Sequence, residues 1–212
     1  MPAIRFERFA PKIRAIVWEG SESPAELLAP LPEAWRGQLS KNAVRLKDTL
    51  SARRALLELA PQAAKEGFEK NSFGKPHFKG QAKLEFSLSH SHGHAAALVS
   101  PYACGVDLQL RVDKITKLRS KFENIEERAF IERQEDEVGA LHVLWGAKES
   151  LFKLWGRRLI DWHDHLIVSE FEHNLSGGQF KGEVRKDGLI IPAHLWFRWI
   201  GNYCLVAAVT DI

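Results

Sequence analysis

The sequence predicts an α+β fold of two similar halves, residues 1–105 and 106–212, each with an antiparallel sheet packed against a long helix. Each half contains one long segment in which apolar residues recur at helical spacing. Each half also ends in strand-like runs with short connections, which favour antiparallel pairing. The order of element types roughly repeats without a clear residue-level repeat, so the pattern indicates a duplicated α+β unit.

The first half begins with the run IRFERFAPKIRAIVWEG, whose β-branched and aromatic residues predict one or two strands ending near Trp18. A helix in one or two pieces is predicted over Glu33–Leu59, and Pro61 ends its pattern. The punctuated stretch NSFGKPHFKG predicts a loop. Strands are predicted in LEFSLS, AAALVS and CGVDLQL.

The second half begins with polar helical material from about Lys114 to Arg133, followed by a strongly apolar helix from about Asp136 to Trp155. Four further strands are predicted in HLIVSEF, GQFKGEVR, HLWFRWI and YCLVAAVT. Gly-Gly, Asp-Gly and Gly-Asn turns separate these runs, and such turns are typical of hairpins.

The composition is that of an ordinary globular protein, with 45% hydrophobic and 27% charged residues. The formal net charge is only +3, which argues against a protein that binds nucleic acid. Cys104 and Cys204 lie in apolar runs without metal or redox spacing, so they are expected to be buried thiols. No secretion signal or membrane span is evident, which predicts a cytoplasmic protein.

Asp107 lies in GVDLQ, residues 105–109, within a run that otherwise alternates like a strand. A half-buried carboxylate needs a partner, because leaving it desolvated and unpaired is costly. A cation is the expected partner. Gln109 is two residues further on and faces the same side of the strand, but carries no charge.

The segment WGAKESLFKLWG, residues 145–156, places Trp145, Glu149 and Lys153 on one helix face. An exposed Glu-to-Lys pair at this spacing usually adds only about 0.3–0.5 kcal/mol to helix stability. The flanking tryptophan and leucines favour a partly buried face instead. A buried acid and base together are typical of a functional site.

The segment FSLSHSHGH contains Ser89 and three histidines, His90, His92 and His94. Histidines spaced by two on a strand can ligate zinc. A turn rich in Ser and His suits a bound anion equally well, and Gly93 makes a continuous strand doubtful. The GKP stretch that contains Lys75 is by itself simply a turn.

Together these segments resemble the 4′-phosphopantetheinyl transferases, specifically the large single-chain class with two pseudo-symmetric halves. The resemblance runs through ARRALL, GKP, FSLSHS, GVDLQ and WGAKESLFK, in the family's order and at similar separations. It covers about half the chain, from Ala52 to Lys153. It implies transfer of the phosphopantetheine arm of coenzyme A to a serine of an apo acyl or peptidyl carrier protein, with release of 3′,5′-ADP.

The resemblance also implies roles for individual residues. Asp107, Glu149 and Gln109 would form the Mg²⁺ site, although Gln109 stands where relatives commonly carry a third acid. Lys153 would steady the pyrophosphate, and Glu149 would accept the serine proton. The residues implied in coenzyme A binding are Arg54 and His90 at the 3′-phosphate, with Lys75 and Ser89 along the nucleotide.

The active site would then lie in a cleft between the two halves, and a monomer would suffice. Three alternatives stay open. A degenerate relative would still bind coenzyme A or a carrier protein without reacting. A magnesium-dependent phosphohydrolase would use Asp107 and Glu149 without a protein acceptor. An RNA-binding module is suggested by the basic isoelectric point and seven tryptophans, although most of these lie in apolar runs typical of a core.

Overall fold

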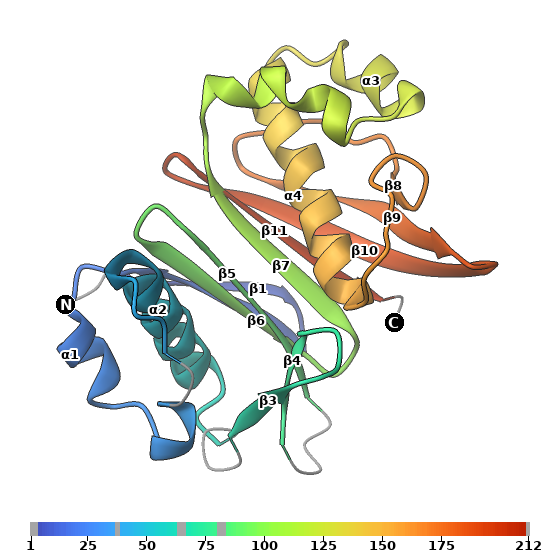
Figure 1. Cartoon of the computed structure of the whole chain (residues 1–212). Helices are drawn as coiled ribbons and strands as arrows, with labels where there is room; N and C mark the ends of the chain where they lie inside the picture. The colour runs from blue at the N-terminus through green and yellow to red at the C-terminus, as the bar shows by residue number, and fades with distance from the viewer. Residues whose placement is uncertain (1–3, 37–38, 63–66, 80–83, 211–212) are drawn as a thin grey trace. The chain divides into compact units, whose positions relative to one another are not determined.

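The structure is a computed structural model that describes residues 4–36, 39–62, 67–79 and 84–210. The chain divides into two compact units, Met1–Tyr102 and Ala103–Ile212. Each unit is a sheet with one long helix across it (Figure 1). The predicted α+β class with antiparallel sheets is confirmed. The predicted division into halves of one transferase fold, with a cleft between them, remains a prediction.

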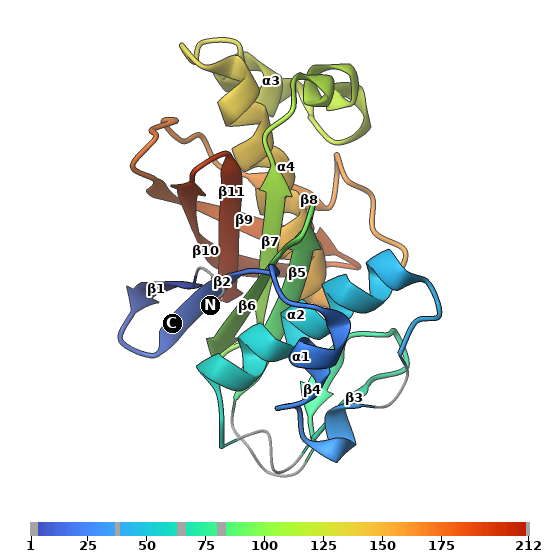
Figure 2. The same cartoon turned by 90° about the vertical axis from the view of Figure 1, so that its left-hand side faces the viewer.

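Unit 1 has a four-stranded antiparallel sheet in the order β1-β2-β6-β5, with α2 packed mainly on β6 and β2. The run predicted to hold one or two strands holds two, and β1 and β2 form a hairpin around Pro11 (Figure 2). The elements are β1 (Ile4–Ala10), β2 (Ile13–Glu19), α1 (Pro24–Leu28), a 3₁₀ turn (Glu33–Trp35), α2 (Ala43–Leu59), β3 (Phe68–Lys70), β4 (Pro76–Phe78), β5 (Glu85–Ser91) and β6 (His94–Ser100).

The predicted helix over Glu33–Leu59 is divided between the 3₁₀ turn and α2. α2 begins where it does because the Asn42 side chain accepts a hydrogen bond from Arg45 N, at 3.0 Å, and so caps the helix. The apolar face of α2 then packs into a core with the sheet. Its largest fully buried members are Trp18, Trp35, Leu50, Leu56 and Phe86.

Unit 2 has a five-stranded antiparallel sheet in the order β7-β11-β10-β9-β8, and α4 packs mainly on β7 and β11. The diagonal course of α4 along β7 is visible in Figure 1. The elements are β7 (Cys104–Leu110), two 3₁₀ turns (Asp113–Lys117 and Arg119–Lys121), α3 (Ile125–Ile131), α4 (Glu137–Trp155), β8 (Leu166–Val168), β9 (Gly178–Lys186), β10 (Leu189–Ile200) and β11 (Tyr203–Thr210).

The prediction of polar helical material from about Lys114 to Arg133 is confirmed, but the helical turns are not continuous. The segment forms two 3₁₀ turns and then α3, which starts at Ile125. Asn124 and Glu127 form a reciprocal capping box, in which each side chain accepts a hydrogen bond from the other's backbone N–H. This local bonding starts a new helix. The preceding segment has too few apolar residues at helical spacing to continue one through it.

The apolar helix prediction is confirmed, because α4 extends from Glu137 to a left-handed C-cap at Gly156. The Asp-Gly hairpin between β9 and β10 is confirmed too. Asp187 and Gly188 both have positive φ, 52° and 77°, as a tight hairpin turn of the primed type requires. The same geometry occurs at His92 and Gly93, with φ of 46° and 81°, between β5 and β6.

The two units share a pattern of connections. In each, a strand that comes before the long helix pairs antiparallel with the unit's last strand: β2 with β6 and β7 with β11. The last two strands form a hairpin in both, β5–β6 and β10–β11. This similarity of order is what the predicted duplication would leave behind.

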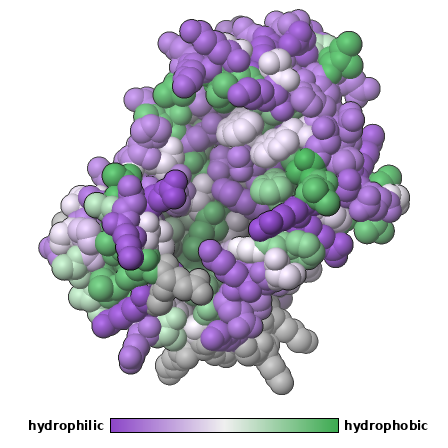
Figure 3. Space-filling view, in the orientation of Figure 1, coloured by the Kyte–Doolittle hydropathy of each residue, from purple (hydrophilic) through white to green (hydrophobic). Residues whose placement is uncertain are grey.

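Cys104 and Cys204 are buried free thiols, as predicted. Within the described residues, no helix combines the length and the apolar character that crossing a membrane would require. Hydrophilic residues cover most of the face seen in Figure 3, with small hydrophobic patches among them.

Candidate active site

Asp107 is held by a lysine from the long helix. It lies on β7 and is largely buried, and Lys153 Nζ donates a hydrogen bond to its Oδ1 at 2.9 Å. The same ammonium donates to Val106 O at 2.8 Å. Lys153 is therefore the cation that the buried carboxylate on this strand requires.

Glu149 lies one helical turn before Lys153 and is half-buried. Its burial, together with the nearby negative charge of Asp107, raises the pKa of Glu149 to about 7, although Lys153 acts in the opposite direction. A carboxyl with this pKa changes protonation state near neutral pH. Such a group can accept a proton from a substrate hydroxyl and can also bind a cation that displaces its own proton.

Two glycines allow the helix to come close enough to the sheet for these contacts. A Cβ atom at Gly105 on β7 would lie 1.9 Å from Ser150 O of α4. A Cβ atom at Gly146 on α4 would lie 2.6 Å from Val206 Cγ2 of β11. Ser150 Oγ then donates to Val206 O at 2.9 Å and closes the packing. The glycine in GVDLQ thus places Asp107 beside the helix that carries Glu149.

The donor set suits a magnesium ion bound together with a phosphorylated substrate. No group of three or more His, Cys, Asp or Glu side chains arranged to hold a metal occurs among the residues that the structure describes. Mg²⁺ needs only one or two carboxylates when substrate phosphates and waters supply the other ligands. Burial first and the charge of Asp107 second raise the pKa of Glu149, and a divalent cation held by the two carboxylates would offset both effects.

The side chain of Gln109 points its amide oxygen at another partner. Oε1 lies 2.8 Å from His142 Nδ1, and Nε2 donates to His142 O at 2.9 Å. Only the amide nitrogen approaches Asp107, at 3.5 Å from its Oδ2. The predicted role of Gln109 as a metal ligand would therefore require this side chain to leave His142.

Lys148 is fully buried and structural in its contacts. Its Nζ lies 2.7 Å from Glu127 Oε2 and donates to Trp162 O at 2.7 Å. Both side chains of the ion pair are at most 1% exposed. The pair connects α3, α4 and the segment before β8 within unit 2.

Aromatic rings lie beside Glu149 on α4. Trp162 stacks on Trp145, with ring centroids 5.1 Å apart, and on Phe152, with centroids 5.8 Å apart. Trp145 precedes Glu149 by four residues and Phe152 follows it by three, so both share its face of the helix. This apolar wall contributes to the desolvation of the carboxyl.

Unit 1 contains a separate cavity of about 640 Å³ with a basic lining. His90 lines it from β5, and Asp48 Oδ2 lies 3.5 Å from His90 Nδ1. An imidazole N–H beside other basic side chains can donate a hydrogen bond to an anion. The other lining residues are Ala34, Trp35, Thr49, Ala52, Arg53, Phe68, Glu69, Lys70, Pro76, Lys79 and Leu88.

The structure places Arg53, rather than the predicted Arg54, in the lining of this cavity. Arg53 donates to Trp35 O and its guanidinium lies over the Phe68 ring, 5.3 Å from the centroid. Arg54 is half-buried on the same helix, with its guanidinium 5.0 Å from the centroid of the Trp18 ring. Sequence reasoning chose between two adjacent arginines, and their different directions from α2 distinguish them.

Lys75 and Ser89 lie near this cavity in the chain but are not among its lining residues. Lys75 is in the β3–β4 turn, where its backbone N–H donates to Asn71 Oδ1 at 3.0 Å. Ser89 is buried on β5, next to His90. His92 is at the tip of the β5–β6 hairpin, so the three histidines do not follow one another along a strand.

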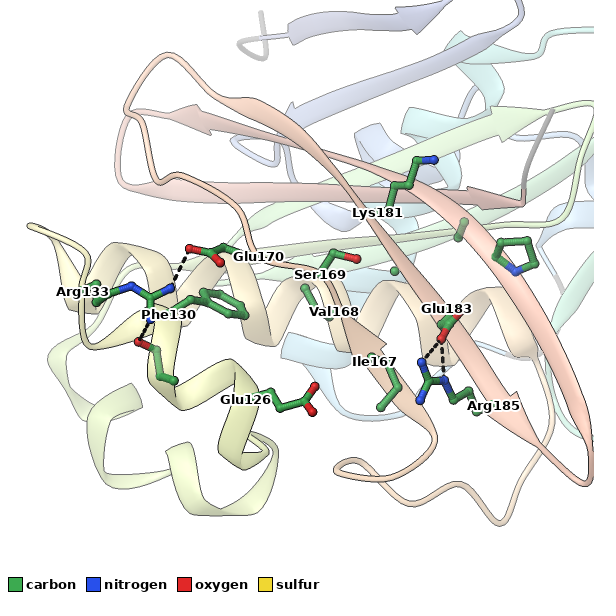
Figure 4. Close-up of a pocket in the computed structure, with 14 residues that line it drawn as sticks. Glu126, Phe130, Arg133, Ile167, Val168, Ser169, Glu170, Lys181, Glu183 and Arg185 are labelled. Atoms are coloured by element: carbon green, nitrogen blue, oxygen red, sulfur yellow. Dashed lines mark hydrogen bonds and ion pairs between the residues drawn. The ribbon is translucent and has the colours of Figure 1, made fainter.

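A second cavity, of about 670 Å³, lies in unit 2 between α3 and strands β8, β9 and β10 (Figure 4). None of the predicted site residues lines it. Two ion pairs involve four of its six charged side chains, and the other two, Glu126 and Lys181, are of opposite charge. Arg133 Nη2 lies 2.7 Å from Glu170 Oε1, and Arg185 pairs with Glu183. It therefore offers little net charge to a ligand.

Several residues near the site were not predicted from the sequence. His142 and Glu127 carry no motif of their own, and they are recognised only from the contacts that they make with Gln109 and Lys148. Trp162 follows the helix in an irregular segment, where periodicity gives no signal. The Asn124–Glu127 spacing was a visible signal, because it matches a capping box.

Comparison with known families supports the resemblance. The model of the 4′-phosphopantetheinyl transferase superfamily matches residues 103–204, which is most of unit 2. Asp107, Glu149 and Lys153 all lie within the matched segment. A comparison with curated protein sequences finds no match. The predicted resemblance to this superfamily is thus confirmed for residues 103–204.

Proposed function

We propose that this protein transfers the 4′-phosphopantetheine group of coenzyme A to a serine hydroxyl of an apo carrier protein. The observation that carries the proposal is Glu149, a carboxyl with a pKa of about 7 beside the Asp107–Lys153 pair, within the segment that matches the superfamily. Phosphoryl transfer depends on positioned charge more than on covalent catalysis. Unit 2 supplies a base, a second carboxylate and an ammonium in one place.

In this proposal Glu149 accepts the proton of the serine, directly or through a water molecule. The serine oxygen then forms a bond to the phosphorus that carries the pantetheine arm, and the bond from that phosphorus to the bridging oxygen breaks. The electron pair of the broken bond leaves with 3′,5′-ADP. The ammonium of Lys153 would offset the negative charge that develops on the pyrophosphate oxygens.

Asp107 and Glu149 are the residues that would hold Mg²⁺. The ion would supply positive charge to the pyrophosphate oxygens as the bond breaks. Without the ion, Lys153 supplies the positive charge beside Asp107. With the ion bound, the Lys153 side chain would turn toward the pyrophosphate. The Trp145–Trp162–Phe152 stack would keep bulk water away from Glu149.

Unit 1 would bind the nucleotide end of coenzyme A. The cavity lined by His90, Arg53, Lys70 and Lys79 collects basic side chains, as a phosphate monoester requires. Arg54, Lys75 and Ser89 are proposed to contribute to the same nucleotide, as the family pattern implies. The shared order of elements in the two units supports a single chain with both functions, and hence a monomer.

The proposal is tested by incubating the protein with coenzyme A, Mg²⁺ and a panel of apo carriers from fatty-acid, polyketide and nonribosomal-peptide pathways. Intact-protein mass spectrometry should show one added phosphopantetheinyl group on at least one carrier. The same carrier with its acceptor serine replaced by alanine is the control and should gain nothing. Coenzyme A binding without any transfer would instead favour a degenerate binding protein. Release of phosphate from small phosphoesters without a carrier would favour a phosphohydrolase.

A further inference from the structure

The side chain of Gln109 connects β7 to α4 through a single partner. Both polar atoms of its carboxamide contact His142, one at the imidazole and one at the backbone carbonyl, at 2.8 and 2.9 Å. His142 is 1% exposed, so its side of the contact is shielded from water, while Gln109 is half-buried. It lies near Asp107 on the strand and two helical turns before Glu149 on the helix.

The pattern of donors and acceptors determines which way the amide faces. The carbonyl oxygen of His142 can only accept, so the atom 2.9 Å away must be the amide nitrogen of Gln109. The amide oxygen then faces His142 Nδ1, which must carry the ring proton. The Val112 N–H donates to the other ring nitrogen, Nε2, at 3.0 Å. Val112 O also lies 3.1 Å from Nε2. Nε2 could donate to this oxygen only if it carried a proton, and that proton would face the proton of the Val112 N–H.

A carboxylate does not fit this arrangement. Glutamate at position 109 would present an acceptor oxygen to the His142 carbonyl, where an amide donor is now 2.9 Å away. Two acceptors at that distance in a buried place repel each other. The pocket beside Asp107 is therefore complementary to glutamine and not to glutamate.

We propose that Gln109 is a positioning residue that fixes α4 on β7 through His142, and that it is not a ligand of the metal. It would hold Glu149 at the correct separation from Asp107, and it would donate to Asp107 Oδ2 rather than compete with it for a cation. This inference rests on the proposed function only in treating Asp107 and Glu149 as the metal ligands. On this view, the neutral Gln109 in place of an acid alters how α4 is held on β7 and does not remove a metal ligand.

A double-mutant cycle on the full chain tests the contact without coenzyme A or a carrier. The variants Gln109→Ala, His142→Ala and the double variant are unfolded in urea. The expected result is strong non-additivity, in which the double variant is no less stable than the less stable single variant. If the alanine variants do not fold, Gln109→Met and His142→Phe repeat the cycle, and their double variant should be more stable than either single one. If the losses of unfolding free energy are additive in the cycle whose variants fold, the proposal is overturned.

Binding of Mn²⁺ to the free protein, followed by electron paramagnetic resonance, separates positioning from ligation. If Gln109 only positions the helix, Gln109→Ala and His142→Ala should weaken Mn²⁺ binding by a similar factor. Gln109→Glu should lower the melting temperature without strengthening Mn²⁺ binding. Tighter Mn²⁺ binding by Gln109→Glu, or loss of binding in Gln109→Ala but not in His142→Ala, would identify Gln109 as a ligand. A protein that fails to transfer phosphopantetheine but passes both tests would refute the proposed function and leave this inference standing.

Discussion

Lys153 Nζ lies 2.9 Å from Asp107 Oδ1, so the buried acid of β7 and the last basic residue of α4 form one ion pair. A divalent cation at Asp107 must compete with this ammonium. We therefore expect Lys153→Met to bind Mn²⁺ about a few-fold more tightly than the wild type at pH 8, since one competing positive charge is removed. The effect should be small, because a partly exposed ion pair contributes little free energy. Transfer should nevertheless become slower, because the pyrophosphate loses a cation.

Calorimetric Mn²⁺ titration and the carrier assay measure the two effects of Lys153→Met separately. Lys153→Arg is the matched control, since it keeps the charge and should retain part of the activity. Weaker metal binding together with slower transfer would mean that Lys153 supports the metal site instead of competing with it.

Glu149 should make the stability of the metal-free protein depend on pH. Its folded-state pKa, about 7, is above the ordinary value of 4.5, so the folded protein binds the proton more tightly than the unfolded chain does. The stabilising contribution is complete below about pH 4.5 and is lost as the pH rises through about 7. Glu149→Gln removes this dependence, so it should gain stability relative to the wild type between pH 5 and pH 8. Thermal melts in EDTA measure the difference, and a constant difference across this range would contradict the assignment.

Gly105→Ala should be strongly destabilising. The added methyl group would meet the backbone of α4 at Ser150 O, which cannot rotate away as a side chain would. Overpacking of this kind costs roughly 1–3 kcal/mol, and more where backbone must shift. Chemical denaturation measures the loss. Gly201→Asn is the control: a Cβ atom there meets nothing within 4 Å, and asparagine tolerates the φ of 56°. Equal losses for both variants would show that the close approach at Gly105 is not needed.

Lys148→Met should destabilise the protein by roughly 3–5 kcal/mol, because it leaves Glu127 buried without its partner. The double variant Lys148→Met, Glu127→Leu should recover part of that loss, since no unpaired charge then remains. Urea unfolding of the four proteins gives the coupling. If Lys148 instead contacted coenzyme A directly, Lys148→Met would weaken coenzyme A binding with little loss of stability.

His90→Ala should weaken the binding of coenzyme A more than that of dephospho-coenzyme A, because the imidazole is assigned to the 3′-phosphate. The ring lines the basic cavity of unit 1, with Asp48 Oδ2 3.5 Å from its Nδ1. Calorimetric titration with both ligands measures the contrast, and His92→Ala at the hairpin tip is the matched control. Equal weakening for both ligands would place His90 elsewhere in the site.

The sequence predicted most of the fold because its signals were local. The alternation in Cys104–Leu110 and the apolar stripe of α4 each specify an element without help from the rest of the chain. The segment before Asn124 was predicted only as helical material. It forms short 3₁₀ turns, because charged residues with good helix propensity do not form a long helix without an apolar face to bury. In that segment, helix propensity predicted the start of α3 less well than the capping box at Asn124 and Glu127 did.

The candidate site was predicted in part. Spacing alone placed Glu149 and Lys153 on one helix face, and the structure brings Asp107 to Lys153. The contact between Gln109 and His142 was beyond sequence reasoning, since the two residues are separated by 33 positions and neither belongs to a pair with known spacing. The choice between Arg53 and Arg54 likewise depended on how α2 is rotated on its sheet.

The central claim is that Glu149 and Asp107 act together in phosphopantetheinyl transfer. It is tested most directly by following 3′,5′-ADP release and carrier mass in one reaction, for the wild type, Glu149→Gln and Asp107→Ala at saturating coenzyme A and Mg²⁺. The account predicts that the wild type releases one 3′,5′-ADP for each modified carrier serine, and that both variants lose nearly all transfer while they still bind coenzyme A. A wild type that modifies no carrier, or variants that transfer at the wild-type rate, would contradict it.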